Sequence, residues 1–83
     1  MPWNLAVLMG GPSPERPISL QTGAAMAEAL RARGHAVVEH DLHRGTFAAL
    51  QEQRPDCVVL ALHGVPGEDG SVQAVLDLLG IPY

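Results

Sequence analysis

Lysine is absent from this chain of 83 residues, and all five of its basic residues are arginines. Together with nine acidic residues they give a formal net charge of −4. A surface that binds a phosphate backbone needs clustered positive charge, so this balance argues against a nucleic-acid partner. The absence of lysine also excludes a phosphate-binding loop whose lysine comes from this chain.

Cysteine and long apolar segments are equally scarce. Cys57 is the single cysteine, so no disulfide can form within the chain, which fits a reducing compartment. We expect Cys57 to be a core residue rather than a nucleophile, because it begins an apolar, β-branched run. The N-terminal stretch MPWNLAVLMGG resembles neither a signal peptide nor a membrane span. These features predict a cytoplasmic protein without a membrane partner.

Apolar and amphipathic segments alternate along the chain and predict one α/β domain over residues 1–83. Expected strands lie at 5–9, 35–42 and 56–62, and expected helices at 19–34, 46–55 and 68–80. Such alternation indicates right-handed βαβ units and a small parallel sheet. The predicted architecture is a three-layer, Rossmann-like βαβαβα domain with strand order 2-1-3, in which the first strand is central.

Side-chain patterns give further expectations about packing and helix ends. Thr46 is a candidate N-cap of the second helix, and Asp69 or Ser71 of the third. Trp3 and Met9 are expected to pack against the helices. The residues expected on the buried faces of the first and third helices are Leu20, Ala24, Ala27, Leu30, Val72, Val75, Leu76 and Leu79.

Two glycine-rich loops follow the first and third strands. In a sheet of order 2-1-3, ligands bind beyond the carboxyl ends of the strands, at the switch point between strands 1 and 3. The loops GGPSPER at 10–16 and HGVPGEDG at 63–70 are expected to meet there. Their glycines permit tight turns and a close approach of the backbone to a ligand. The loop residues expected to shape this site are Gly10, Gly11, Ser19, Gly64, Glu68, Asp69 and Gly70.

Glu15 is the first candidate site residue. Proline is tolerated in the first turn of a helix, so Pro17 places the start of the first helix near Arg16, just after Glu15. One interpretation is that Glu15 complements the helix dipole. The other is that its carboxylate receives a cation, such as the ammonium group of an amino acid whose carboxylate lies near the helix N–H groups.

His63 is the second candidate, because it stands where the third strand leaves the sheet. It is either hydrogen-bonded to the loop backbone or aimed as a donor into the cleft. In the second case Glu68 or Asp69 would fix its tautomer.

The other sequence patterns that could indicate a functional site are weaker. GGPSPE departs from the dinucleotide-binding pattern G-x-G-x-x-G. His40 and His43 are expected on an exposed edge rather than around a metal. Ser19 is expected to be a second capping residue near the start of the first helix.

The two loops also carry a resemblance to a known family. The motif G-G-x-S-x-E-R-x-x-S-L at 10–20 and the motif H-G-x-x-G-E-D-G at 63–70 are similar to those of bacterial D-alanine–D-alanine ligases. The chain resembles the N-terminal domain of these ligases over essentially all 83 residues. The resemblance implies the Rossmann-like fold called pre-ATP-grasp.

The resemblance also implies a function. These ATP-grasp ligases phosphorylate the carboxylate of a first D-alanine with ATP and Mg²⁺, and a second D-alanine attacks it to give the dipeptide of the peptidoglycan precursor, which serves cell-wall biogenesis and cell shape. Glu15 matches the glutamate that binds the first D-alanine's ammonium group. His63 matches a histidine lining the same subsite, and Ile18 an apolar residue that touches the methyl group. Glu15 and His63 are therefore the catalytic-site candidates.

Two residues and the length depart from the family pattern. Pro17 stands in place of the usual acidic residue, and Val65 in place of the usual arginine. The central and ATP-grasp domains are missing, so this chain is not expected to hold ATP or Mg²⁺ or to be active alone. It is expected to be a natural truncation, an isolated domain or a fragment of a longer enzyme.

Two alternatives remain open at this stage. The chain is either part of the ligase or a non-catalytic α/β module that self-associates, for example as a homodimer through its sheet edges. A ligase that joins D-alanine to D-lactate or D-serine fits the same residues.

Overall fold

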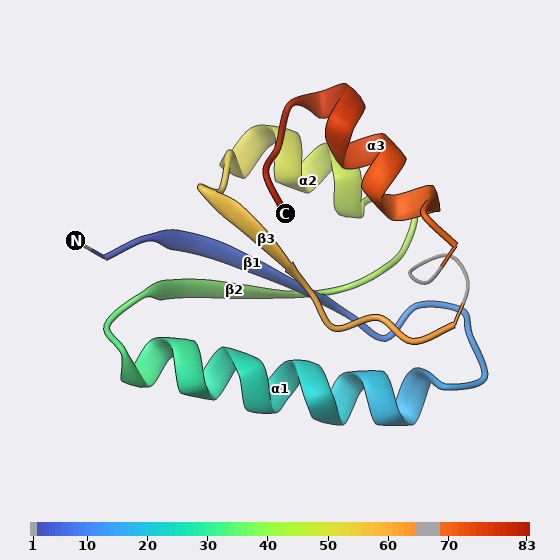
Figure 1. Ribbon diagram of the computed structural model, residues 1–83, viewed down its shortest axis with the longest axis horizontal. Coiled ribbons are helices and arrows are strands. Elements are labelled where there is room, and N and C mark those ends of the chain that lie inside the picture. Colours follow the sequence, from blue (N-terminus) through green and yellow to red (C-terminus); the bar gives the residue numbers. More distant parts are fainter. Residues whose placement is uncertain (1, 65–68) are drawn as a thin grey trace.

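A computed structural model describes residues 2–64 and 69–83, and its strands and helices alternate as the sequence predicted (Figure 1). The second and third strands are shorter than expected because their ends pass into loops, whereas the first begins one residue earlier than expected, at Asn4. In chain order the elements are β1 (Asn4–Met9), α1 (Arg16–Ala32), β2 (Ala36–Asp41), α2 (Thr46–Gln53), β3 (Cys57–Leu60) and α3 (Ser71–Leu79).

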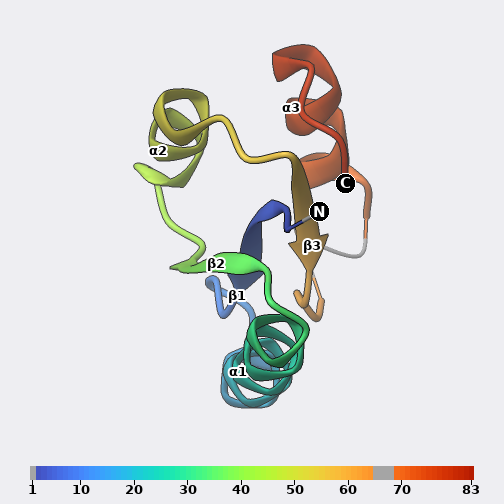
Figure 2. The same ribbon diagram turned by 90° about the vertical axis from the view of Figure 1, so that its left-hand side faces the viewer.

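The three strands form one parallel sheet of order β2-β1-β3. Asn4 of β1 pairs with Ala36 of β2, and Leu5 of β1 pairs with Cys57 of β3. Helix α1 covers one face of the sheet, and α2 and α3 cover the other (Figures 1 and 2). The predicted three-layer α/β architecture and its strand order are therefore confirmed.

The core lies on both faces of β1, which explains why that strand is apolar throughout. Val7 and Leu8 are both fully buried, and successive side chains of a strand point to opposite faces. Leu8 packs with Leu50 and Leu76 on the side of α2 and α3, whereas Val7 packs on the side of α1. A central parallel strand covered on both faces reads as a continuous apolar run.

Helix α1 lies against the sheet through a stripe of small residues. Its buried positions are Ser19, Gly23 and Ala27. A Cβ atom built on Gly23 would lie 2.6 Å from Cβ of Met9, so the helix approaches the strand closely only because Gly23 has no side chain. The expected burial of Ala24 is wrong: Ala24 is exposed, because the stripe runs at intervals of four through its neighbour.

Other packing expectations are confirmed only in part. Met9 is buried and packs on the α1 side, as predicted. Trp3 does not pack against a helix as predicted: it is 51% exposed, and its backbone N–H donates to Nδ1 of His35. In α3, Val72 and Leu76 are buried and Val75 is partly buried, as expected.

The predicted caps are corrected at two helices. Thr46 is the first residue of α2 rather than its N-cap, which is Gly45. The Thr46 hydroxyl accepts a hydrogen bond from the His43 backbone N–H at 3.0 Å, so it braces the preceding loop. Helix α3 has Gly70 as its N-cap, and the Asp69 carboxylate accepts from the first helical N–H at 2.9 Å.

After α3 the chain returns to the outer edge of β3. The backbone N–H of Val58 donates to the carbonyl of Pro82 at 2.8 Å. The outer edge of β3, which no other strand covers, is therefore partly hydrogen-bonded by the C-terminal segment. Among the described residues, no helix combines the length and apolar character needed to cross a membrane.

Candidate functional site

The two glycine-rich loops meet at the carboxyl ends of β1 and β3. A Cβ atom built on Gly64 would lie 2.5 Å from Oγ of Ser13 and 2.7 Å from Oε2 of Glu15. The backbone of the second loop therefore passes directly against the Glu15 carboxylate. Glu68, predicted as a partner of His63, and Val65 lie outside the described residues.

Glu15 stands at the N-cap position of α1, but its side chain makes no capping hydrogen bond. The Ser13 hydroxyl donates to Oε2 of Glu15, and the Glu15 backbone N–H donates to the Ser13 oxygen at 3.1 Å. The Ser13 hydroxyl is the main cause that lowers the pKa of Glu15, followed by the backbone amide of Glu15 and the charge of His63. The carboxylate is thus ionised, exposed and held in place.

Ser13 was not predicted as a site residue. It is buried, whereas the prolines on both sides of it, Pro12 and Pro14, are exposed. A serine two residues before a carboxylate in a proline-rich turn is a signal for a local side-chain hydrogen bond, and that signal could have identified it.

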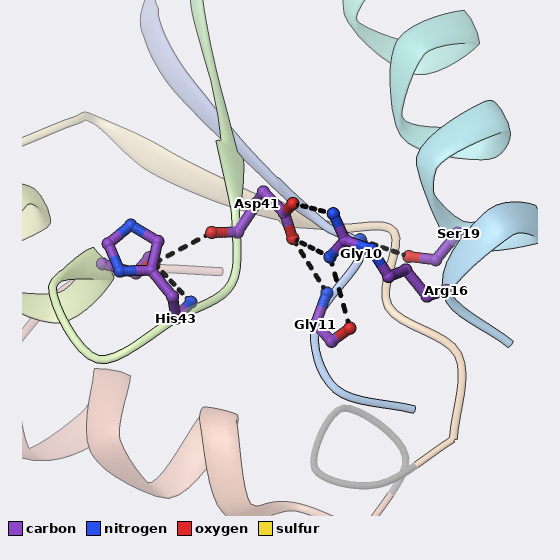
Figure 3. A network of polar contacts seen from close by, with 7 residues as sticks. Gly10, Gly11, Arg16, Ser19, Asp41 and His43 are labelled. Atoms are coloured by element: carbon purple, nitrogen blue, oxygen red, sulfur yellow. Dashed lines mark hydrogen bonds and ion pairs between the residues drawn. The ribbon is translucent and has the colours of Figure 1, made fainter. Parts of the chain in front are cut away.

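Ser19 has a different role from the predicted capping role. Its side chain is fully buried. Its Oγ accepts a hydrogen bond from the Gly10 N–H at 2.8 Å and donates one to the Ala61 carbonyl at 2.6 Å. Ser19 therefore connects the end of β1 to the end of β3, from which the two loops leave the sheet. Figure 3 shows its contact with Gly10.

Arg16 and Asp41 form an ion pair that the sequence analysis missed (Figure 3). Nη1 of Arg16 donates to Oδ1 of Asp41 at 2.5 Å, and Nη2 contacts Oδ2. Oδ1 also accepts from the Gly11 N–H at 3.1 Å. Asp41 ends β2 at the same edge of the sheet as the two loops. This position in the sequence could have indicated that Asp41 contacts the first loop.

The Arg16–Asp41 pair predicts how stability varies with pH. Hydrogen bonds from Arg16, and then from the Gly11 amide, hold the pKa of Asp41 below its ordinary value. Because the carboxylate is favoured in the folded state, its contribution is present above the unfolded pKa, near 3.9, and is lost as pH falls through the lowered folded pKa. We expect the stability difference between the native chain and Asp41→Asn to be constant above about pH 5 and to shrink below about pH 4. Urea unfolding across this range measures it; a difference that persisted below the folded pKa would contradict the assignment.

A cavity of about 570 Å³ lies beside the first loop, on the side of α2 and α3. Its walls include Leu42, Phe47 and Val75, with Arg16 and Arg44 also lining it. Glu15 and His63 do not line this cavity. This cavity is thus separate from the predicted carboxylate and imidazole.

The other residues considered in the sequence analysis, Ile18, His40 and His43, make separate contacts. Ile18 is 57% exposed in the first turn of α1, three residues after Glu15. The imidazole of His40 contacts Oε1 of Gln53 at 3.1 Å, and Nδ1 of His43 accepts from Gly45. Within residues 2–64 and 69–83, no group of three or more metal-binding side chains is arranged to hold an ion.

Placing a methyl group at Gly64 is expected to displace the Glu15 carboxylate. Gly64 has φ of +73°, so Gly64→Ala adds backbone strain as well as contacts with Ser13 and Glu15. Glu15 can swing away from the methyl group, which would break its hydrogen bond with Ser13. We expect the pKa of Glu15 to rise toward its ordinary value, as measured by NMR titration of the carboxyl carbon.

The matched control for this substitution is Gly34→Ala. Gly34 has φ of +91° and no heavy atom within 4 Å of a built Cβ, so it adds only the strain, about 1–2 kcal/mol. The pKa of Glu15 should not change in the control. Equal titration curves for both variants would show that Gly64 does not shape the carboxylate site.

Comparisons with known proteins point to one family. No protein-family model matches the chain. It is 55% identical over 82 residues to the D-alanine–D-alanine ligase of Sphingopyxis alaskensis, covering 99% of this chain and 27% of that protein. It is 58% identical over 80 residues to the corresponding ligase of Moorella thermoacetica, covering 96% of this chain and 26% of that protein.

Solved structures agree with the sequence comparison. The fold is similar to the D-alanine–D-alanine ligase of Bacillus anthracis complexed with ATP, with a TM-score of 0.81 and 38% identity. That similarity covers 98% of this chain and 28% of the solved chain. The chain therefore spans about a quarter of the length of the relatives that it matches.

Proposed function

We propose a function from the premise that this chain is a homologue of the D-alanine–D-alanine ligases, whose sequences it matches over nearly its whole length. In this proposal the chain is the N-terminal domain of such a ligase and binds the first D-alanine. The observation that carries the proposal is the ionised Glu15 carboxylate, held by Ser13 and facing the second loop at Gly64.

The chemistry of an amino acid fits this carboxylate. An ammonium group donates charge-assisted hydrogen bonds to a carboxylate, which are stronger than those between neutral groups. His63 acts electrostatically on Glu15, so its imidazole lies in the same environment, and in this proposal it donates a hydrogen bond to the substrate. Ile18, exposed in the first turn of α1, offers an apolar surface to the substrate methyl group.

In this proposal ATP and Mg²⁺ are not held by this chain. We assign nucleotide and metal binding to other parts of a complete ligase. This chain supplies the binding and orientation of the first substrate, in a cytoplasmic enzyme of peptidoglycan synthesis; D-lactate and D-serine remain alternatives for the second substrate.

A hybrid enzyme tests the proposal in a complete protein. In this hybrid ligase, residues 1–83 replace the matching segment of the Sphingopyxis alaskensis ligase, to which they are 55% identical. We expect the hybrid ligase to form D-alanyl-D-alanine from D-alanine and ATP. A folded hybrid that binds ATP but forms no dipeptide would contradict the proposal.

A further inference from the structure

The same two elements, α1 and β2, are joined by two ion pairs, which start from opposite ends of α1. Arg16 pairs with Asp41 at the end that carries the loops, and Arg31 pairs with Glu39, 2.8 Å away, farther along the helix. Their side chains are similarly exposed, 45% and 43% in the first pair and 47% and 36% in the second. Exposed ion pairs contribute little to stability, so stability does not distinguish the two pairs.

The contacts to the first loop do distinguish them. Oδ1 of Asp41 accepts both from Arg16 and from the Gly11 N–H. Nη1 of Arg16 also reaches the Gly11 carbonyl at 3.4 Å. The segment from Gly11 to Arg16 is therefore fastened at both ends to one carboxylate, as Figure 3 shows.

This segment needs such an attachment because it begins at two consecutive glycines, which by themselves restrict the backbone little. Gly10 and Gly11 have φ of +70° and +81°, and glycine moves readily between this region and others. Two prolines stiffen the rest of the segment but do not fix where it points. The residue just before the second attachment point is Glu15.

We propose that Asp41 is a positioning residue for Glu15: it holds Gly11 and Arg16 together, and so fixes the carboxylate that receives the substrate ammonium group. The positioning concerns this chain alone, whereas its consequence for D-alanine rests on the proposed function. A carboxylate is required because its two oxygens match the planar fork of the guanidinium and leave a lone pair for the Gly11 amide. An amide side chain would keep one acceptor and lose the paired geometry.

The first test measures the order of the loop in the chain itself. We expect Asp41→Asn to lower the ¹⁵N order parameters of Gly11, Ser13 and Glu15 from about 0.85 toward 0.6. The matched control is Glu39→Gln, which removes the charge of the other α1–β2 pair and should leave these values unchanged. Unchanged loop order in Asp41→Asn, or an equal loss of order in the control, would overturn the proposal whether or not the chain binds D-alanine.

The second test asks whether Asp41 acts through Glu15 in the hybrid ligase. We expect Asp41→Asn to raise KM for the first D-alanine roughly two- to fivefold, with KM for ATP and kcat unchanged. The increase should vanish when Glu15→Gln is already present, because two residues that act through one contact are not additive. An increase of the same size in both backgrounds would overturn the positioning role.

These outcomes separate the two proposals. If Glu15→Gln leaves KM for the first D-alanine unchanged, the proposed function fails, and the loop measurement still decides whether Asp41 positions Glu15. If Glu15→Gln raises KM but Asp41→Asn changes neither KM nor loop order, the proposed function stands and the positioning role is wrong.

Discussion

Replacing Glu15 with glutamine is expected to raise KM for the first D-alanine roughly ten- to a hundredfold in the hybrid ligase. Glutamine has the same shape as glutamate but carries no charge, so the substrate ammonium group loses a charge-assisted partner. The backbone should not move, because Ser13 still accepts a hydrogen bond from the residue 15 amide. The effect belongs to binding of one substrate, so KM for ATP should remain the same.

Glu28→Gln is the matched control for this prediction. Glu28 is an exposed glutamate on the same helix, α1, and its replacement changes the net charge by the same amount. We expect KM to remain unchanged in the control. If both variants raised KM equally, the effect would come from the overall charge of the domain rather than from a contact with the substrate.

The features that could be predicted from the sequence are those that local patterns determine. The apolar run of β1, the alternation of strands and helices, and the start of α1 near Pro17 each follow from a few neighbouring residues. The strand order then places the two loops at one edge of the sheet. The place of Glu15 at the start of α1 could be predicted because a helix start is visible in a short stretch of sequence.

The contacts that hold the site together could not be predicted in the same way. Arg16 and Asp41 are 25 residues apart, and Ser19 and Ala61 are 42 residues apart. Both contacts depend on the register of the sheet, in which Met9 pairs with Asp41 and Leu8 pairs with Leu60, and no local pattern specifies that register. The prediction that Ala24 is buried was also wrong. The face of α1 that approaches β1 is set by small residues such as Gly23 rather than by the most hydrophobic ones.

The largest expected loss of stability comes from Ser19→Ala. The Ser19 hydroxyl is hydrogen-bonded to both the Gly10 N–H and the Ala61 carbonyl. Both of these residues are buried, so water does not readily replace the lost hydroxyl. A buried polar group left without a partner costs about 1–3 kcal/mol. With two such groups, we expect the free energy of unfolding to fall by about 2–6 kcal/mol, as measured by urea denaturation.

The control for this loss is Ser71→Ala, which removes an exposed hydroxyl from the first turn of α3. Exposed substitutions of this kind change stability by about 0.5 kcal/mol or less. A similarly small loss in Ser19→Ala would mean that the bond between the ends of β1 and β3 is dispensable. A large loss would show that one buried hydroxyl fixes the strand ends from which the Glu15 loop and the His63 loop begin, and therefore the separation of the two side chains.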